Sequence, residues 1–281
     1  MKIAAVIPTY NRPAILRQCL ESLLAQDRLL DEIQVIDNSG NNETEYLISS
    51  SFPGISYCRF QENIGSAGGF YEGIVRTFQN HDYIWTLDDD IVAQKMTLAE
   101  ACARIPMLEA RGNLGAFRVN YGKSKDDVIE FGSFAWRGTF IKSTAIQKIG
   151  LPDRDFFLYG EDVEYSMRLR RAGYKIFGVC AGRLSEITPS PRKSEYVLGS
   201  RFRFYSDTFR LYYAFRNQLA VHLRFGQVPQ AVGIVLYGAK GFFYFLFSGK
   251  PRSCIAIVNG LFDGLRKKLG KNPSYAPQGN Y

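Results

Sequence analysis

Short apolar runs alternate with helical patterns over residues 1–90 of the chain. Each apolar run ends at a proline, a turn-forming residue or an acidic residue, which is typical of buried strands. We expect strands at Ile3–Ile7, Glu32–Asp37, Ile55–Phe60 and Tyr83–Leu87, and helices at Pro13–Ala25 and Phe70–Phe78. Strands and helices that alternate at this spacing predict an α/β fold, in which helices flank a mainly parallel sheet.

The pattern changes near residue 200, and so does the charge. Thr188–Ser194 is rich in proline and serine and predicts a loop, and Arg203–Phe225 has helical spacing. Of the formal charge of +8, residues 201–281 account for 12 Lys and Arg against two acids, whereas residues 1–200 are nearly neutral. We therefore divide the chain into an α/β domain over residues 1–200 and a basic, aromatic-rich helical region over residues 201–281.

Ala231–Phe247 in this second region is apolar apart from Lys240. The lysine costs a membrane-spanning helix about 2.5–3.5 kcal/mol. We therefore expect an amphipathic helix that lies in an anionic membrane surface, with Tyr237, Lys240 and Tyr244 on its polar side. It is flanked by basic residues that suit lipid headgroups: Lys250, Arg252, Arg266, Lys267, Lys268 and Lys271. The alternative is a core helix or a homo-oligomer interface; no nucleic-acid-binding motif accompanies the charge.

Composition and cysteine spacing indicate a folded protein of a reducing compartment. The chain is 46% hydrophobic and 22% charged, which excludes a disordered or fibrous protein. Its five cysteines form no CxxC pair, which argues against a disulfide framework or a zinc site. The apolar run near the N-terminus is too short for a signal peptide. We expect a peripheral protein on the cytoplasmic face of the cell membrane.

Three consecutive carboxylates, Asp88, Asp89 and Asp90, follow the strand predicted at Tyr83–Leu87. Ligands of open α/β sheets bind at the carboxyl ends of strands, and adjacent carboxylates repel one another unless a cation compensates them. Mg²⁺ or Mn²⁺, held by one or two carboxylates together with substrate phosphates, suits this pattern. Asp88 and Asp90 would share one side of an extended segment and be the ligands. The alternative is an acidic turn that caps the following helix.

Two further segments carry candidate binding residues. Asp37 ends a strand, and it either accepts a hydrogen bond from a pyrimidine or a ribose, or forms an Asx turn with Ser39. The segment from Asn63 to Gly69 contains three glycines, whose backbone can approach a phosphate or a sugar closely. It lacks the Gly-Lys-Ser/Thr of a Walker loop, and a plain strand-to-helix turn is the alternative.

A second acidic site lies at a predicted helix start. An aromatic segment that includes Tyr159 leads to Glu161 and Asp162, and the helix ends near Gly173. A carboxylate at this position suits a general base, although the helix dipole alone stabilises an acid there by about 0.3–1 kcal/mol. Trp136 is either a platform for a sugar ring or a core residue.

Five motifs in one order resemble glycosyltransferase family 2, which has the GT-A fold. They are Pro8-Thr9-Tyr10-Asn11-Arg12-Pro13, Val35-Ile36-Asp37-Asn38, Asn63 to Gly69, Asp88 to Asp90 and Gly160-Glu161-Asp162-Val163-Glu164, and they cover about residues 1–180. The glycine-rich and triple-aspartate motifs are similar to those of galactofuranosyltransferases. Tyr212-Tyr213-x-x-Arg216-Asn217 is similar to a stretch after the catalytic domain in this branch and in rhamnosyltransferases.

The resemblance implies an inverting transfer from a nucleotide sugar to an acceptor hydroxyl. Asp162 would be the base, and Trp136, Tyr159 and Glu161 would line the acceptor side. Mn²⁺ or Mg²⁺ would bridge the donor diphosphate and be held by Asp88 and Asp90. The residues implied for nucleotide-sugar binding are Pro8, Thr9, Arg12, Asp37, Asn63, Gly65, Gly69, Asp88 and Asp89.

One departure from the family concerns a metal-ligating histidine that often follows the base. That part of the chain contains no histidine, since the sequence has only His81 and His222. Glu186 would substitute as a carboxylate ligand, or water would complete the coordination.

The expected donor is UDP-galactofuranose, and the expected acceptor is a lipid-linked cell-surface glycan. dTDP-rhamnose is the alternative donor, because Asp37 can pair with either pyrimidine. Two other classes are a non-catalytic glycan-binding relative and a sugar-phosphate nucleotidyltransferase. The latter normally has a glycine-rich basic loop after the first strand, and the segment from Pro8 to Arg12 is not such a loop.

Overall fold

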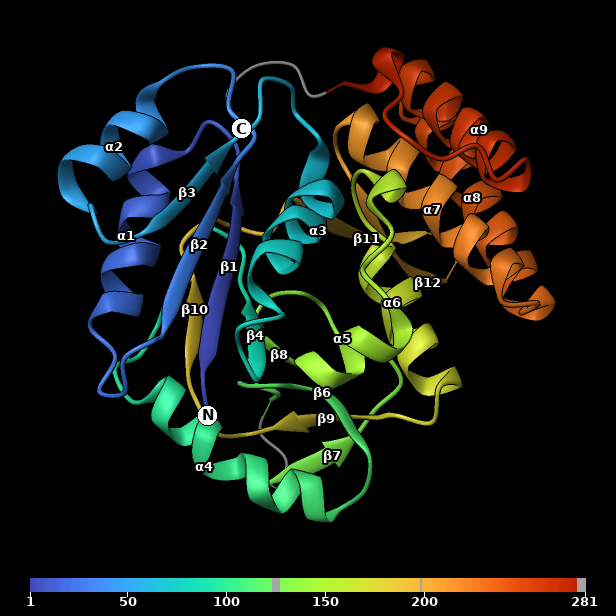
Figure 1. The fold of residues 1–281 in the computed structure, drawn as a ribbon. Helices are drawn as coiled ribbons and strands as arrows, with labels where there is room; N and C mark the ends of the chain where they lie inside the picture. Colours follow the sequence, from blue (N-terminus) through green and yellow to red (C-terminus); the bar gives the residue numbers. More distant parts are fainter. Residues whose placement is uncertain (123–126, 198, 277–281) are drawn as a thin grey trace. The chain divides into compact units, whose positions relative to one another are not determined.

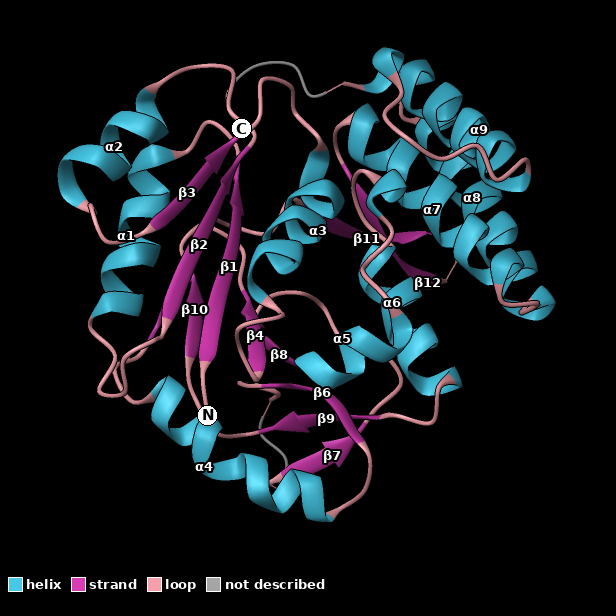
Figure 2. Cartoon of the chain, in the orientation of Figure 1, coloured by secondary structure: helices cyan, strands magenta, loops and turns pink. Residues whose placement is uncertain are grey.

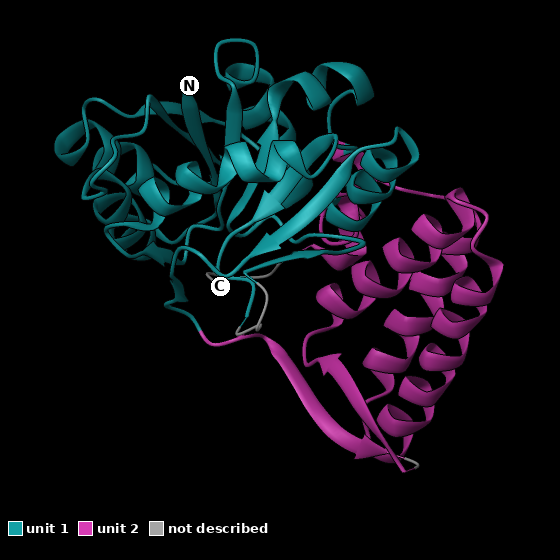
Figure 3. Ribbon diagram, turned by 90° about the horizontal axis from the view of Figure 1, so that it is seen from below, with its two compact units in different colours: residues 1–153, 162–188, 280–281 teal, residues 154–161, 189–279 magenta. Residues whose placement is uncertain are grey.

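The computed structural model describes residues 1–122, 127–197 and 199–276, and these separate into two compact units (Figure 3). The first unit comprises Met1–Asp153 and Asp162–Thr188. The second comprises Arg154–Glu161 and the described part of Pro189–Gly279. A short segment from the middle of the chain therefore belongs to the C-terminal unit.

An eight-stranded sheet forms the centre of the first unit (Figure 1). In spatial order its strands are β3 (Ser56–Arg59), β2 (Glu32–Asp37), β1 (Ile3–Thr9), β4 (Tyr83–Thr86), β8 (Thr139–Lys142), β6 (Leu114–Arg118), β9 (Lys175–Val179) and β7 (Val128–Glu130). The first four are mutually parallel, and β6 is parallel to β9. Only β8 and β7 run antiparallel to their neighbours. The predicted α/β fold, with four strands at the expected places, is confirmed.

Helices cover both faces of this sheet (Figure 2). They are α1 (Pro13–Leu24), α2 (Glu43–Ser51), α3 (Gly65–Thr77), α4 (Thr97–Ala110), α5 (Ser143–Ile149) and α6 (Glu161–Arg171). Alternate residues of β1 enter different cores: Ile3 and Ile7 pack with α1, α2 and α4, whereas Ala4 and Val6 pack with α3, α5 and α6. β1 is apolar on both sides because both are covered.

Most of the glycine-rich segment is helical, whereas the predicted helix begins only after it. α3 begins at Gly65 rather than near Phe70. A Cβ on Gly69 would lie 2.6 Å from Cβ of Pro8, and one on Gly73 would lie 2.2 Å from Cγ1 of Val6. The glycines therefore let the helix approach β1 closely, a use that periodicity alone does not distinguish from ligand binding.

Helices α7 (Thr208–Arg224), α8 (Val228–Phe247) and α9 (Pro251–Leu265) make up most of the second unit. A hairpin of β11 (Arg192–Val197) and β12 (Ser200–Tyr205) packs with them. This hairpin replaces part of the loop predicted at Thr188–Ser194 and the first residues of the helix predicted at Arg203–Phe225. Phe202 and Phe204 alternate with exposed residues, as a strand requires. Asp207 caps the start of α7 by accepting a 2.8 Å hydrogen bond from the amide of Arg210.

The close approach of α3 to β1 makes a stability prediction. Gly73→Ala adds a methyl group against buried Val6 and should lower the free energy of unfolding by about 1–3 kcal/mol through overpacking. Gly54→Ala is the control, because a Cβ there meets nothing within 4 Å. Thermal melts of the two variants measure the difference, and equal melting temperatures would contradict the packing argument.

Candidate functional site

The carboxyl ends of β1, β2 and β4 lie at one edge of the sheet, because these strands are parallel neighbours. β1 ends at Thr9, β2 ends at Asp37, and the triple-aspartate segment follows β4. This is the edge at which open α/β sheets bind ligands. Candidate donor-binding residues from three separate motifs therefore converge in the first unit.

Asp37 is fully buried and holds two hydrogen bonds. It accepts one of 2.8 Å from the amide of Ser39, which is the Asx turn considered as an alternative, and one of 2.7 Å from the hydroxyl of Tyr57. Burial and this contact raise the pKa of Tyr57, so the phenol keeps its proton and donates. Tyr57 belongs to no motif and was not predicted. The carboxylate is therefore held in one orientation at the strand end.

Asp89 is the member of the aspartate triplet that is anchored by the protein. Only 1% of it is exposed; it accepts a 2.7 Å hydrogen bond from the hydroxyl of Thr9 and is paired with the guanidinium of Arg12. Burial raises the pKa of Asp89 to about 6, while Arg12 and Thr9 oppose this rise. Two predicted nucleotide-binding residues thus position the triplet.

Asp90 is held by the segment that returns to the triplet late in the chain. Its carboxylate accepts a hydrogen bond from the hydroxyl of Thr188, and its carbonyl accepts one of 2.9 Å from the amide of Ile187. β5 (Ile91–Ala93) pairs antiparallel with β10 (Leu184–Glu186), and this pairing brings Glu186 opposite Ile91. The carboxylate of Glu186 forms an ion pair with Arg137. Glu186 is therefore near the triplet in the fold and already has a cationic partner.

Asp88 differs from its neighbours, because no described residue donates a hydrogen bond to its carboxylate. Burial and the charges of Asp90 and Asp89 raise the pKa of Asp88 to about 7. A divalent cation would remove this repulsion, so the carboxylates fit such an ion. No group of three or more His, Cys, Asp or Glu side chains in the described ranges is arranged to hold a metal. A cation here would have one or two protein ligands and depend on substrate or water for the others.

Arg118 connects the triplet with the predicted base. Burial and the neighbouring charge of Arg137 lower the pKa of Arg118, whereas the charges of Asp88 and Asp162 oppose this change. Both carboxylates are therefore close enough to act on one guanidinium. A cavity of about 280 Å³ is lined by Ile91, Arg118, Asn120, Arg137, Leu184 and Glu186. Sequence analysis missed both arginines, because neither lies in a motif that predicts a site.

Asp162 is the second residue of α6 and is partly exposed. One carboxylate oxygen accepts a 2.8 Å hydrogen bond from the amide of Val163, and the Asp162 carbonyl accepts one of 2.7 Å from the hydroxyl of Ser166. The helix dipole favours the ionised form of a carboxylate at a helix start, and the ionised form is the one that a general base needs. Glu161 is 3% exposed, and Tyr159 stacks on Tyr205 with ring centroids 4.9 Å apart.

Trp136 and Asn63 have structural contacts that their predicted binding roles did not anticipate. Trp136 is 5% exposed and stacks on Phe70 at 4.9 Å, which favours the alternative of a core tryptophan. The side chain of Asn63 accepts a 2.8 Å hydrogen bond from the amide of Gly65. Gly65 has φ of 76°, so glycine is required where the chain enters α3.

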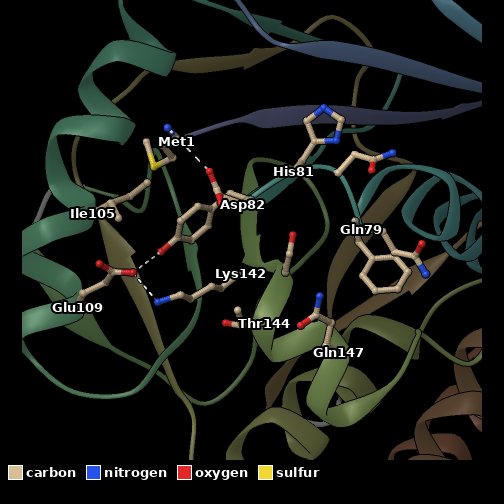
Figure 4. A pocket seen from close by; sticks show the side chains of 13 residues that line it. Met1, Gln79, His81, Asp82, Ile105, Glu109, Lys142, Thr144 and Gln147 are labelled. Carbon is tan, nitrogen blue, oxygen red and sulfur yellow. Dashed lines mark hydrogen bonds and ion pairs between the residues drawn. The ribbon is translucent and has the colours of Figure 1, made fainter.

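A larger cavity, of about 520 Å³, lies at the opposite ends of the strands (Figure 4). Lys142 and the hydroxyl of Tyr83 both contact Glu109, and Asp82 pairs with the terminal amine. None of the predicted site residues lines it. Because it lies at the amino ends of β1 and β4, it is separate from the site at the carboxyl ends.

Comparison with solved structures identifies the fold. The chain is similar to a crystal structure of Staphylococcus aureus TarS, with a TM-score of 0.54 and 16% identity, over 79% of this chain and 39% of that one. It is also similar to GalNAc-T7 solved with UDP, GalNAc and Mn²⁺, with a TM-score of 0.57 and 15% identity, over 79% and 47% of the two chains. The chain spans less than half of either protein, and the shared fold is GT-A.

Proteins that are similar to this chain in sequence are also sugar transferases. GlfT1, a galactofuranosyltransferase of Mycobacterium tuberculosis, is 28% identical over 63% of this chain and 67% of its own length. The GlfT1 of Mycolicibacterium smegmatis is 24% identical over 77% and 81%. The abequosyltransferase RfbV of Salmonella typhimurium is 35% identical over 35% and 31%. The sequence profile of the glycosyl transferase family 2 matches residues 4–161, more than half of the chain, and the protein therefore belongs to this family of glycosyltransferases.

Proposed function

We propose that this glycosyltransferase moves galactofuranose from UDP-galactofuranose, with inversion, to a hydroxyl of a lipid-linked cell-surface glycan. The observation that carries the proposal is that Thr9, Asp37 and the triple-aspartate segment, from three separate motifs, converge at the carboxyl ends of β1, β2 and β4. The hydrogen bond from Thr9 to Asp89 joins two of these motifs directly. The galactofuranosyltransferase relatives support the choice of sugar. Transfer of rhamnose from dTDP-rhamnose is the second candidate.

The donor would bind across the carboxyl ends of β1, β2 and β4. Asp37 would accept a hydrogen bond from the pyrimidine or the ribose, and its contact with Tyr57 keeps the carboxylate oriented for this. Thr9 and Arg12 would act largely through Asp89, which both contact. Residues beside these would line the nucleotide path: Pro8, Asn63, Gly65 and Gly69.

Asp88 and Asp90 would hold Mn²⁺ or Mg²⁺, with Glu186 as a further ligand if it leaves Arg137. The raised pKa of Asp88 and its lack of a donor from the described residues support this assignment. When bound, the ion supplies positive charge that stabilises the departing diphosphate.

Asp162 would take the proton of the acceptor hydroxyl. The acceptor oxygen forms a bond to the anomeric carbon as the bond from that carbon to the diphosphate oxygen breaks, and the electron pair leaves with the diphosphate. Attack opposite the leaving group inverts the anomeric centre. General base catalysis of this kind contributes roughly 10²–10⁴ in rate. Tyr159 and Glu161, next to the base in sequence, are proposed for the acceptor side.

Replacement of the base tests the proposed reaction. Asp162→Asn should lower turnover with UDP-galactofuranose by roughly 10²–10⁴, because the amide cannot accept the proton. UDP binding, measured by calorimetry, should stay largely intact. Asp127→Asn, at an exposed aspartate of the same unit, is the control. Near-normal turnover of Asp162→Asn would remove Asp162 from this role, and faster transfer from dTDP-rhamnose would favour the second candidate.

Chelation tests the metal. EDTA should abolish transfer, and added Mn²⁺ or Mg²⁺ should restore it, since the ion neutralises the leaving diphosphate. Asp88→Asn should raise the metal concentration required for half-maximal activity by at least about tenfold, whereas Glu21→Gln on the exposed side of α1 should not. Full activity in EDTA would overturn the metal assignment.

We also infer that the second unit binds an anionic membrane surface. α8 is long and apolar enough, by length and composition, to cross a membrane. Its predicted polar side faces the hairpin: Tyr237 donates a 2.7 Å hydrogen bond to the carbonyl of Arg203, and Lys240 donates one of 3.1 Å to that of Ser200. The exposed side is apolar and carries Val228, Val232, Val235, Leu236, Phe243, Leu246 and Phe247.

α9 extends this apolar surface. One side of α9 packs closely on α7: a Cβ on Gly260 would lie 2.6 Å from the carbonyl oxygen of Tyr212, and one on Gly264 would lie 2.5 Å from that of Arg216. The other side of α9 does not take part in this packing. This side exposes Ile255, Val258, Phe262 and Leu265. Exposed basic residues surround the two helices, and Asp263, the one acid of α8 and α9, accepts a hydrogen bond from Tyr212. An apolar surface bordered by cations suits an anionic bilayer.

Flotation with vesicles tests the membrane surface. The double variant Phe247→Glu/Phe262→Glu should lose binding to phosphatidylglycerol vesicles, because it places charge on both apolar stripes. Leu29→Glu, at a 71% exposed leucine of the first unit, should bind as the wild type does. Unchanged flotation of the double variant would contradict the inference. So would a wild-type protein that forms dimers and does not bind the vesicles.

A further inference from the structure

Arg216 and Asn217 form a buried polar cluster in α7 that the proposed chemistry does not use. Arg216 is 1% exposed and Asn217 is fully buried. A buried guanidinium or carboxamide is unfavourable unless its donors are satisfied. Their hydrogen bonds here join the two side chains to each other and to backbone carbonyls of two other segments, which indicates a role in shaping the backbone.

Asn217 donates hydrogen bonds to backbone carbonyls of one short segment, Phe156 to Tyr159. Its Nδ2 lies 2.9 Å from the carbonyl oxygen of Phe156 and 2.7 Å from those of Leu158 and Tyr159. A Cβ on Gly160 would lie only 3.0 Å from Cβ of Asn217, so this segment passes directly over the asparagine. A single carboxamide therefore binds the carbonyls of three residues in this segment: Phe156, Leu158 and Tyr159.

Arg216 fixes the orientation of that carboxamide. Its Nε donates a 2.7 Å hydrogen bond to Oδ1 of Asn217, which turns Nδ2 toward the carbonyls. Its Nη2 donates to the carbonyl of Phe156 at 2.9 Å, and its Nη1 to that of Gly270 at 2.6 Å. The guanidinium also lies 4.6 Å from the ring centre of Tyr213. Arg216, Asn217 and the ring of Tyr213 therefore support the segment together.

The supported segment has a strained backbone. Phe157 and Tyr159 have φ of 64° and 66°, and Gly160 has φ of 87°. A left-handed conformation at a non-glycine residue costs about 1–3 kcal/mol and persists only where the surroundings enforce it. Hydrogen bonds from Asn217 provide that enforcement. Asp162 follows two residues after Gly160, so the conformation of this segment sets where α6 begins.

We propose that Arg216 and Asn217 are positioning residues for the base, acting through the strained segment from Phe156 to Gly160. This rests on the proposed function, because it takes Asp162 as the base. Without the hydrogen bonds from Asn217, the residues with positive φ return to ordinary backbone angles. The carboxylate of Asp162 is then no longer oriented toward the acceptor hydroxyl. Donor binding, which uses the ends of β1, β2 and β4, is unaffected.

Asn217→Asp is the sharpest test, since it keeps the side-chain size and turns a carboxylate oxygen toward three carbonyl oxygens. We expect kcat to fall by about 10- to 100-fold, the scale of a misplaced reacting group. The donor KM and the Kd of UDP should change by less than about twofold, with UDP stoichiometry near one. Gln218→Glu, the same chemical change one residue along α7, should leave kcat unchanged.

A double-mutant cycle separates positioning from general damage. In the Asp162→Asn background, Asn217→Asp should lower the residual rate by less than about twofold, because the carboxylate through which it acts is gone. Asn217→Ser, which removes the carboxamide without adding charge, answers the same question if Asn217→Asp does not bind UDP. Multiplying effects, or a normal kcat with intact UDP binding, would overturn the proposal. Normal turnover of Asp162→Asn would instead reject the proposed function.

Discussion

Electrostatic repulsion among three adjacent carboxylates at the end of a buried strand is the constraint on which the functional edge depends. Asp89 is stabilised by Arg12 and Thr9, and Asp90 by Thr188. Asp88 has burial and two like charges against it, with Arg137 and Arg12 as partial compensation. The β5–β10 pairing brings Glu186 next to the triplet, and the charge of Asp88 affects the pKa of Arg118. A fold that needed only stability would not gather these groups, and the proposed cation, bound together with the donor diphosphate, would relieve their repulsion.

Much of the first unit could be predicted from the sequence, because its strands are buried on both faces. Apolar runs such as Ile3–Ile7 have few alternatives to a central strand, and the motifs at their ends mark one edge of the sheet. The hairpin of β11 and β12 was missed because its first strand, Arg192–Val197, is almost entirely exposed. Exposed strands carry little periodic signal, so this Pro/Ser-rich stretch predicts a loop instead of a strand.

The candidate site was predictable where residues are consecutive and not where they meet only through folding. Asp37 and Asp162 stand in motifs, whereas Tyr57, Arg118 and Arg137 come to the site only through folding. The glycine-rich segment shows a second limit. Three glycines suit a phosphate-binding segment or a helix packed tightly on a strand, and the close approach of Gly69 to Pro8, which accounts for one of them, is visible only in the fold.

The segment Arg154–Glu161 lies in the middle of the chain but is part of the C-terminal unit. A chain cut at Ser200 would remove Tyr213, the aromatic neighbour of Phe157, and would remove the hydrogen-bond donors that α7 supplies to the segment. The catalytic region is therefore not an interchangeable module. Recombination between relatives, natural or engineered, would have to transfer α7 together with the residues before the base, and inheritance of the two as a pair is the expected trace of that dependence.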